Sequence, residues 1–160
     1  MRDSVKVKGF YKLAIVDHAE DGTTKIVGKT PWIKNTVVNL GFQDYIVGSV
    51  GAIAGSKQVS HFALGTGTAP GATDTSLNGE LTHAAGNRFT MTPSAVSSKT
   101  LQMVGTLASN IITATAAIQN IGVFNTSTTN AGTLLCGNTY TVSTLQTNQS
   151  VNVTYQLRFS

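Results

Sequence analysis

The stretch SVNVTYQLRFS, residues 150–160, decides the fold class. Apolar and aromatic side chains occupy every second position, and polar side chains stand between them. A period of two places the two kinds of side chain on opposite faces of an extended strand. The pattern therefore predicts a strand, held in a sheet up to its end, with these residues directed inward: Val151, Val153, Tyr155, Leu157 and Phe159.

A second alternating stretch, SVKVKGFYKLAIVDH, spans residues 4–18. Its inward face is predicted to carry Val5, Val7, Tyr11, Leu13 and Ile15, and its outward face Lys6, Lys8, Phe10 and Lys12. An acidic, glycine-containing turn follows, and then KIVGK (25–29), which is typical of a return strand. We therefore expect a basic hairpin over about residues 4–30.

The apolar spacing widens in KNTVVNLGFQDYIVGSVGAIAG, residues 34–55. This wider spacing predicts one helix over about residues 36–54, although three glycines inside it weaken the helix. Asn35 or Thr36 is the expected N-cap, and Gly55 is the expected end.

From residue 58 onward, the chain consists of short strand-like segments separated by turn residues. The clearest are VSHFALG (59–65), TLQMVGTL (100–107), IITATAAIQNIGVFN (111–125) and TLLCGNTYTVSTL (133–145). The sequence thus predicts a mainly β fold, an antiparallel β-sandwich or jelly-roll-like arrangement with one packed helix, as a single domain over residues 1–160.

Composition argues against several classes of protein. The single cysteine, Cys136, excludes an internal disulfide, and no Cys/His cluster has the spacing of a metal site. No apolar run is long enough to span a membrane, and the amino terminus lacks the apolar core of a signal peptide. We expect a protein made in a cytoplasm, with no membrane partner, no metal and no cofactor.

The catalytic candidates are weak. FALGTGTAPGATDTSLNGEL (62–81) is rich in glycine, but it lacks the lysine and the following helix of a phosphate-binding loop. Asp74 and Glu80 show no sequence sign of the apolar pocket or charged neighbour that paired-carboxylate catalysis requires. Cys136 has three possible partners, His18, His61 and His83, none of them in a triad pattern. We expect no catalytic residues and no enzymatic activity.

Positive charge is concentrated near the amino terminus, where seven of the eleven lysines and arginines lie within the first 34 residues. Nucleic-acid binding, simple solvation of a strand and contact with an acidic protein surface all fit this distribution. We favour the acidic protein surface and expect no nucleic-acid partner. The predicted interface residues are Arg2, Lys6, Lys8 and Lys12.

The order of segments resembles small structural proteins of tailed-bacteriophage virions, including capsid decoration proteins and tail- or head-fibre modules. The similar pieces are KNTVVNLGFQDYI (34–46), residues 62–81, NIGVFN (120–125), AGTLL (131–135) and the terminal strand. Asn120 stands where that group has an acidic residue.

The resemblance implies a non-enzymatic capsid decoration, or cement, protein located in the virion. Its implied partners are the major capsid protein and further copies of itself, as a homotrimer. A tail-fibre, tail-tip or collar component that contacts the host is the first alternative. A carbohydrate-binding module is a more remote one.

Overall fold

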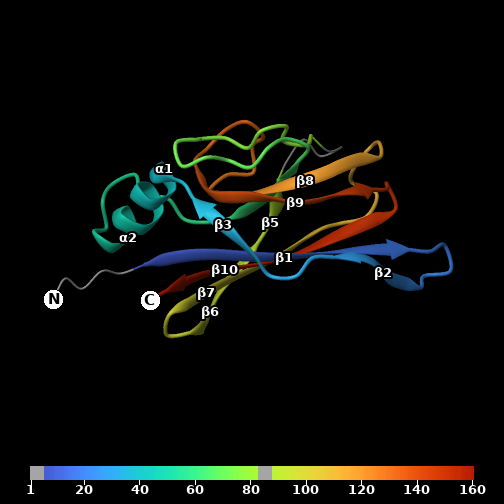
Figure 1. Cartoon of the computed structure of the whole chain (residues 1–160), viewed down its shortest axis with the longest axis horizontal. Helices are drawn as coiled ribbons and strands as arrows, with labels where there is room; N and C mark the ends of the chain where they lie inside the picture. Colours follow the sequence, from blue (N-terminus) through green and yellow to red (C-terminus); the bar gives the residue numbers. More distant parts are fainter. Residues whose placement is uncertain (1–5, 83–87) are drawn as a thin grey trace.

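The computed structural model describes residues 6–82 and 88–160, and strands dominate them (Figure 1). Strand β10 (Gln149–Phe159) lies between β1 (Val7–His18) and β7 (Thr100–Leu107), antiparallel to both. The alternation in its sequence has the predicted consequence, because Val151, Val153, Tyr155 and Leu157 are all buried.

The other strands complete one antiparallel sheet. They are β2 (Thr24–Lys29), β3 (Ile33–Val37), β4 (His61–Gly65), β5 (Phe89–Thr90), β6 (Thr92–Ser97), β8 (Ala116–Phe124) and β9 (Leu134–Leu145). The strand order is β5-β4-β8-β9-β3-β1-β10-β7-β6, with β2 paired to β1. The predicted mainly β antiparallel fold is confirmed.

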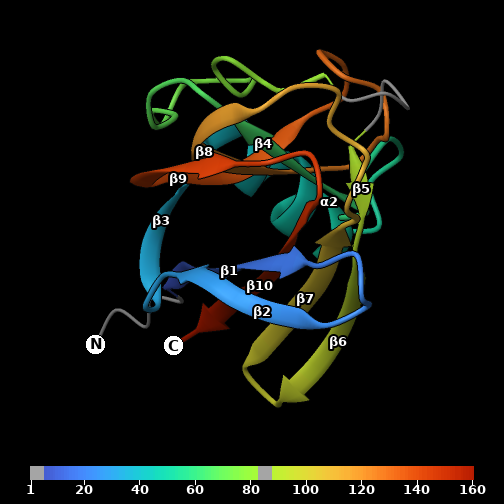
Figure 2. The same cartoon turned by 90° about the vertical axis from the view of Figure 1, so that its right-hand side faces the viewer.

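The sheet curves into two layers and nearly closes into a barrel. Figure 2 shows β4, β8 and β9 in one layer and β1, β2, β7 and β10 in the other, with β3 joining them at one side. At the other side, the two ends of the strand order, β5 and β6, are separated in the chain only by Met91. The amide of Met91 donates a hydrogen bond to the carbonyl of Ser60, the residue that directly precedes β4, and this bond ties the corner between β5 and β6 to the start of β4.

The amino-terminal hairpin forms as predicted within the described residues. Strand β2 pairs with the far half of β1, from Ala14 opposite Lys29 to His18 opposite Thr24. Gly22 in the intervening turn has a φ of 83°, a conformation that glycine adopts without strain. Val5 lies outside the described residues.

The helix is shorter than the predicted 36–54 segment. It runs continuously through α1 (Asn39–Gly41), the π-helical η1 (Phe42–Val47) and α2 (Gly48–Val50). The predicted caps are wrong: Asn35 and Thr36 lie in β3, where sheet pairing holds them, and the C-cap is Gly51 rather than Gly55. Pairing with β1 and β9 prevails there over the helical spacing of the apolar residues.

Close packing on the sheet explains why a glycine stands at position 41, inside the helix. A Cβ atom at this position would lie 2.2 Å from the carbonyl oxygen of Leu135 in β9. The glycine therefore allows the helix backbone to pack directly on the sheet.

Residues inside the barrel form one core, whose largest fully buried members include Tyr11, Phe62, Met103 and Tyr155.

The glycine-rich segment after β4 is a long loop attached to β8. Asn120 donates hydrogen bonds from Nδ2 to the carbonyls of Thr68 (3.1 Å) and Asn78 (2.8 Å). Leu77 of the same loop is buried in a second, smaller apolar cluster. Because Nδ2 is a donor and an ionised carboxylate is not, an amide at position 120 suits this loop better than an acid.

Candidate functional site

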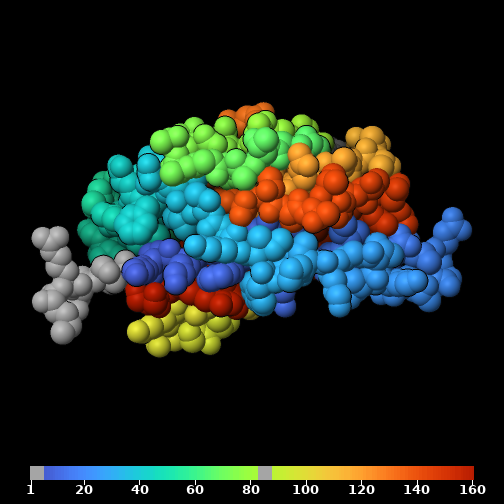
Figure 3. Space-filling view, in the orientation of Figure 1, coloured from blue at the N-terminus to red at the C-terminus, as the bar shows by residue number. Residues whose placement is uncertain are grey.

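The predicted interface lysines lie on the outer face of the sheet. Lys6, Lys8 and Lys12 are exposed, and strand alternation places them on the side of β1 opposite the buried Tyr11. Arg2 lies outside the described residues. Figure 3 shows the surfaces of β1 (blue), the segment leading into β3 (light blue) and β10 (red) side by side.

Neighbouring strands add residues to this surface. Arg158 of β10 lies opposite Lys8, and Lys34 of β3 lies opposite Phe10. Trp32, just before β3, keeps 40% of its surface exposed. We call the set the basic–aromatic face: Lys8, Phe10, Lys12, Trp32, Lys34 and Arg158.

Cations cover both aromatic rings of the basic–aromatic face. The Arg158 guanidinium carbon lies 4.4 Å from the Phe10 ring centroid and 5.5 Å from that of Trp32. Lys12 Nζ lies 5.1 Å from the Trp32 centroid. Gln156 accepts two hydrogen bonds from Arg158, of 3.0 and 2.7 Å, and these hold the guanidinium in place. The rings and cations therefore form one contiguous surface rather than separate side chains.

The charge on this face has no compensation within the three strands that carry it. Lys8 and Arg158 are direct cross-strand neighbours, an arrangement in which like charges destabilise the sheet. Asp17 is the only carboxylate in β1, β3 or β10, and it lies at the far end of β1. An anionic partner would relieve this repulsion.

The two candidate catalytic acids are not paired with each other. Asp74 is exposed, and its carboxylate accepts a hydrogen bond of 2.9 Å from the amide of Gly71. Glu80, by contrast, has a side chain that is 1% exposed and that forms an ion pair with Arg88. The structure thus supplies Glu80 with a charged neighbour that no pattern in the sequence indicated.

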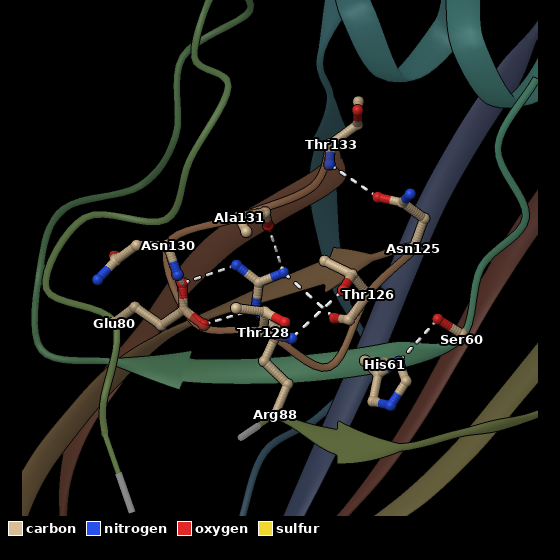
Figure 4. A network of polar contacts seen from close by, with 10 residues as sticks. All are labelled: Ser60, His61, Glu80, Arg88, Asn125, Thr126, Thr128, Asn130, Ala131 and Thr133. Carbon is tan, nitrogen blue, oxygen red and sulfur yellow. Dashed lines mark hydrogen bonds and ion pairs between the residues drawn. The ribbon is translucent and has the colours of Figure 1, made fainter. Parts of the chain in front are cut away.

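Arg88 is the centre of a polar network between loops (Figure 4). Its Nε and Nη2 bind the two oxygens of Glu80 at 2.5 and 2.9 Å, and its Nη1 donates to the carbonyls of Thr126 and Ala131. Its guanidinium carbon lies 3.3 Å from the centroid of the Phe124 ring. Both carboxylate oxygens of Glu80 and all three guanidinium nitrogens of Arg88 therefore have partners within the protein. The arrangement holds loops together rather than presenting a group to a substrate.

The candidate nucleophile and two of its possible partners form hydrogen bonds with other residues. His18 Nε2 lies 2.9 Å from Ser150 Oγ, and His61 Nδ1 lies 2.7 Å from Ser60 Oγ. Cys136 is fully buried, and Tyr155 donates a hydrogen bond of 2.8 Å to its sulfur. Burial raises the pKa of the Cys136 thiol well above its usual range. His83 lies outside the described residues.

Among residues 6–82 and 88–160, no three histidine, cysteine, aspartate or glutamate side chains gather as metal ligands would. Over the same residues, no helix combines the length and apolar character needed to cross a lipid bilayer.

No protein-family model, curated protein or solved structure matches this chain. The residues themselves are therefore the basis for a functional conclusion. The alternation of residues 4–18 predicted the lysines of β1, but Arg158 and the role of Trp32 were not predicted, because these residues join the face only through strand pairing. The alternation in β10 did place Arg158 among the outward-facing positions, and this was the one sign in the sequence that Arg158 lies on the outer face of the sheet.

Proposed function

We propose that this chain is a non-enzymatic structural protein of a tailed-bacteriophage virion, and specifically a capsid decoration protein. In this role it binds the outer surface of the capsid and stabilises it by adding contacts between neighbouring subunits. The observation that carries the proposal is the basic–aromatic face, whose positive charge and aromatic rings suit contact with an acidic protein surface.

The electrostatics of this face support a protein partner. Lys8 and Arg158 repel each other across β1 and β10 in the free protein, so an acidic surface gains energy by pairing with both. Aromatic residues and arginine are also the residue types enriched in protein interfaces. Trp32 and Arg158 are therefore the expected anchors, and the lysines set orientation and association rate.

Nucleic acid is a less suitable partner for the same face. Single-stranded nucleic acids bind through bases stacked on free aromatic rings. Here Arg158 lies over both Phe10 and Trp32, and Lys12 also lies over Trp32, so stacking would have to displace these cations. Tyr11, another aromatic residue of β1, is fully buried and offers no ring for stacking.

The virion context comes from the resemblance of residues 34–46, 62–81, 120–125, 131–135 and 150–160 to phage structural modules. A decoration protein acts through buried area, and a specific interface needs roughly 1,000 Å² or more. We propose that it binds as a homotrimer to the major capsid protein, because symmetric copies multiply each contact. Binding only to the assembled capsid then raises the cost of separating its subunits.

Particles with and without the protein test this proposal directly. We expect electron microscopy to show added density over the capsid, and particles that lack the protein to lose integrity at lower temperature. Equal heat resistance together with no added capsid density would contradict the decoration role. Density restricted to the tail would instead indicate the tail-fibre, tail-tip or collar alternative.

The carbohydrate-binding alternative requires several exposed aromatic side chains in a row on one surface. Among the described residues, the large exposed aromatics are Trp32 and Phe42, which lie on separate elements. A glycan-array measurement with no bound sugar is the expected result.

A further inference from the structure

A cavity of about 330 Å³ lies inside the barrel, beneath the connection between β2 and β3. Its inner wall is apolar and draws on β1, β3, β8, β9 and β10. The residues of that wall are Leu13, Ile15, Ile33, Ile118, Tyr140 and Val151. This cavity has no part in the proposed contact with a capsid.

The cavity exists because β3 is short. Strand β3 bridges β1 and β9, but its pairing with β1 ends where Ile33 meets Tyr11. Beyond that point β1 pairs with β2, and β2 has no pairing with β9. The seam between the β1–β2 hairpin and β9 is therefore not closed by hydrogen bonds, and Figure 2 shows these two layers facing each other at this end. The remainder of the cavity is lined by Gly28, Lys29, Thr30, Pro31, Thr141 and Ser143.

Tyr140 is the exceptional residue of this cavity. It is 8% exposed, and its buried hydroxyl has no hydrogen-bond partner within the described protein. The other three tyrosines each donate a hydrogen bond: Tyr11 to the Thr139 carbonyl, Tyr45 to the Thr133 carbonyl and Tyr155 to the Cys136 sulfur. A buried hydroxyl without a hydrogen-bond partner lowers the free energy of unfolding by about 1–3 kcal/mol. A ligand that hydrogen-bonds this hydroxyl would remove that cost.

The position of the Tyr140 ring is fixed by packing. The ring meets Tyr11 edge to face, with centroids 6.3 Å apart and planes at 66°. Tyr11 is itself fully buried and hydrogen-bonded to β9. The ring of Tyr140, which lines the cavity, is thereby held in one place, as a group that orients a ligand should be.

We propose that this cavity binds a small, neutral, mainly hydrocarbon molecule that carries one hydroxyl or carbonyl group, which hydrogen-bonds the Tyr140 hydroxyl. The volume falls within the range of about 300–1,000 Å³ typical of ligand pockets. The lining contains no carboxylate, and its one cation, Lys29, is exposed. The wall therefore favours a neutral molecule over a charged one.

Binding of 1-naphthol and of naphthalene to the full-length protein tests this inference. The two probes differ by one hydroxyl, and amide chemical shifts in NMR titrations report both affinity and location. We expect shifts in the cavity residues and about tenfold tighter binding of 1-naphthol than of naphthalene. Equal affinities would mean that water serves the hydroxyl, and would overturn the proposal without any variant.

The variant Tyr140→Phe removes only the unpartnered hydroxyl and should fold, with thermal unfolding no lower than in the wild type. It should weaken 1-naphthol binding about tenfold and leave naphthalene unchanged. Tyr45→Phe is the matched control, because Tyr45 lines a separate groove between the helix and β7 and β10. An absence of shifts up to the solubility limit, or shifts confined to that groove, would overturn the proposal.

Discussion

Glu80 and Arg88 form a buried two-point ion pair, with 2.5 Å between Nε and Oε1 and 2.9 Å between Nη2 and Oε2. Both side chains are 1% exposed. Glu80 also accepts a 3.4 Å hydrogen bond from the amide of Asn130, so the pair links the segment between β4 and β5 to the loop between β8 and β9. A carboxylate examined as a catalytic acid thus has a structural role.

Substitution of Arg88 with Met should be strongly destabilising. It would leave the Glu80 carboxylate buried without a counter-ion, and loss of one partner of a buried pair costs about 3–5 kcal/mol. Denaturant titration measures the change in the free energy of unfolding. The double variant Glu80→Leu/Arg88→Met should cost less than the sum of the single changes. A single-variant loss below about 1 kcal/mol would show that the pair is not structural.

Asn120→Asp should loosen the long loop after β4. The change removes the two donated hydrogen bonds to Thr68 and Asn78 and places a carboxylate beside their carbonyl oxygens. We expect a loss of about 1–3 kcal/mol in the free energy of unfolding. Asn138→Asp is the control, since Asn138 donates to the Lys34 carbonyl at an exposed site. Equal losses in the two variants would contradict the anchoring role of Asn120.

The stability of the protein should fall at alkaline pH because its four tyrosines are buried. Burial raises the pKa values of Tyr11, Tyr45, Tyr140 and Tyr155 above the ordinary value of 10.0. Below that value the tyrosines are neutral in both states, and their contribution is fully present. Above it the unfolded chain loses protons first, so the free energy of unfolding decreases as the pH rises towards the folded-state pKa values.

A spectrophotometric titration checks the alkaline prediction. Tyrosinate absorbance should appear together with the loss of far-ultraviolet β signal, in one cooperative step. Ionisation of two or more tyrosines while the β signal remains intact would show that the rings are accessible in the folded protein.

The Cys136 thiol should be unreactive in the folded protein. Burial raises its pKa, so the thiolate that attacks a disulfide reagent is not formed near neutral pH. A chromogenic disulfide reagent at about pH 8 should react with one thiol per chain only after denaturant is added. Rapid labelling of the folded protein would contradict this burial.

Charge reversal on the basic–aromatic face should weaken binding to particles. The double variant Lys8→Glu/Lys12→Glu should lower affinity about tenfold at low salt, because it converts attraction to an acidic surface into repulsion. The difference should shrink near 1 M salt, where the Debye length is about 3 Å. Co-sedimentation with particles measures the bound fraction.

Lys25→Glu/Lys57→Glu supplies the control, since it changes net charge equally at sites in β2 and beyond the helix. It should bind like the wild type. Equal weakening by both pairs would remove the basic–aromatic face from the interface. Binding to a single-stranded oligonucleotide that is lost only in Lys8→Glu/Lys12→Glu would favour a nucleic-acid partner instead.

The sequence by itself determined several of the strands and the inward faces that their alternation predicts. In β1, β7 and β10 the period of two is a local property of the extended chain, and a buried face enforces it, as Tyr11, Met103 and Tyr155 show. The exposed positions of Lys8 and Lys12 follow from the same alternation. These features needed no knowledge of which strand pairs with which.

Only the tertiary structure decided the contacts between distant segments. The helix begins at Asn39 because β1 and β9 hold β3 as a strand up to Val37, against the helical spacing of its side chains. Arg88 meets Glu80, and Arg158 meets Trp32, through loop packing and strand register that no local pattern encodes. The cavity beside Tyr140 likewise results from the point where β3 begins, because a missing bridge between two strands is a property of the closed sheet rather than of any segment of the chain.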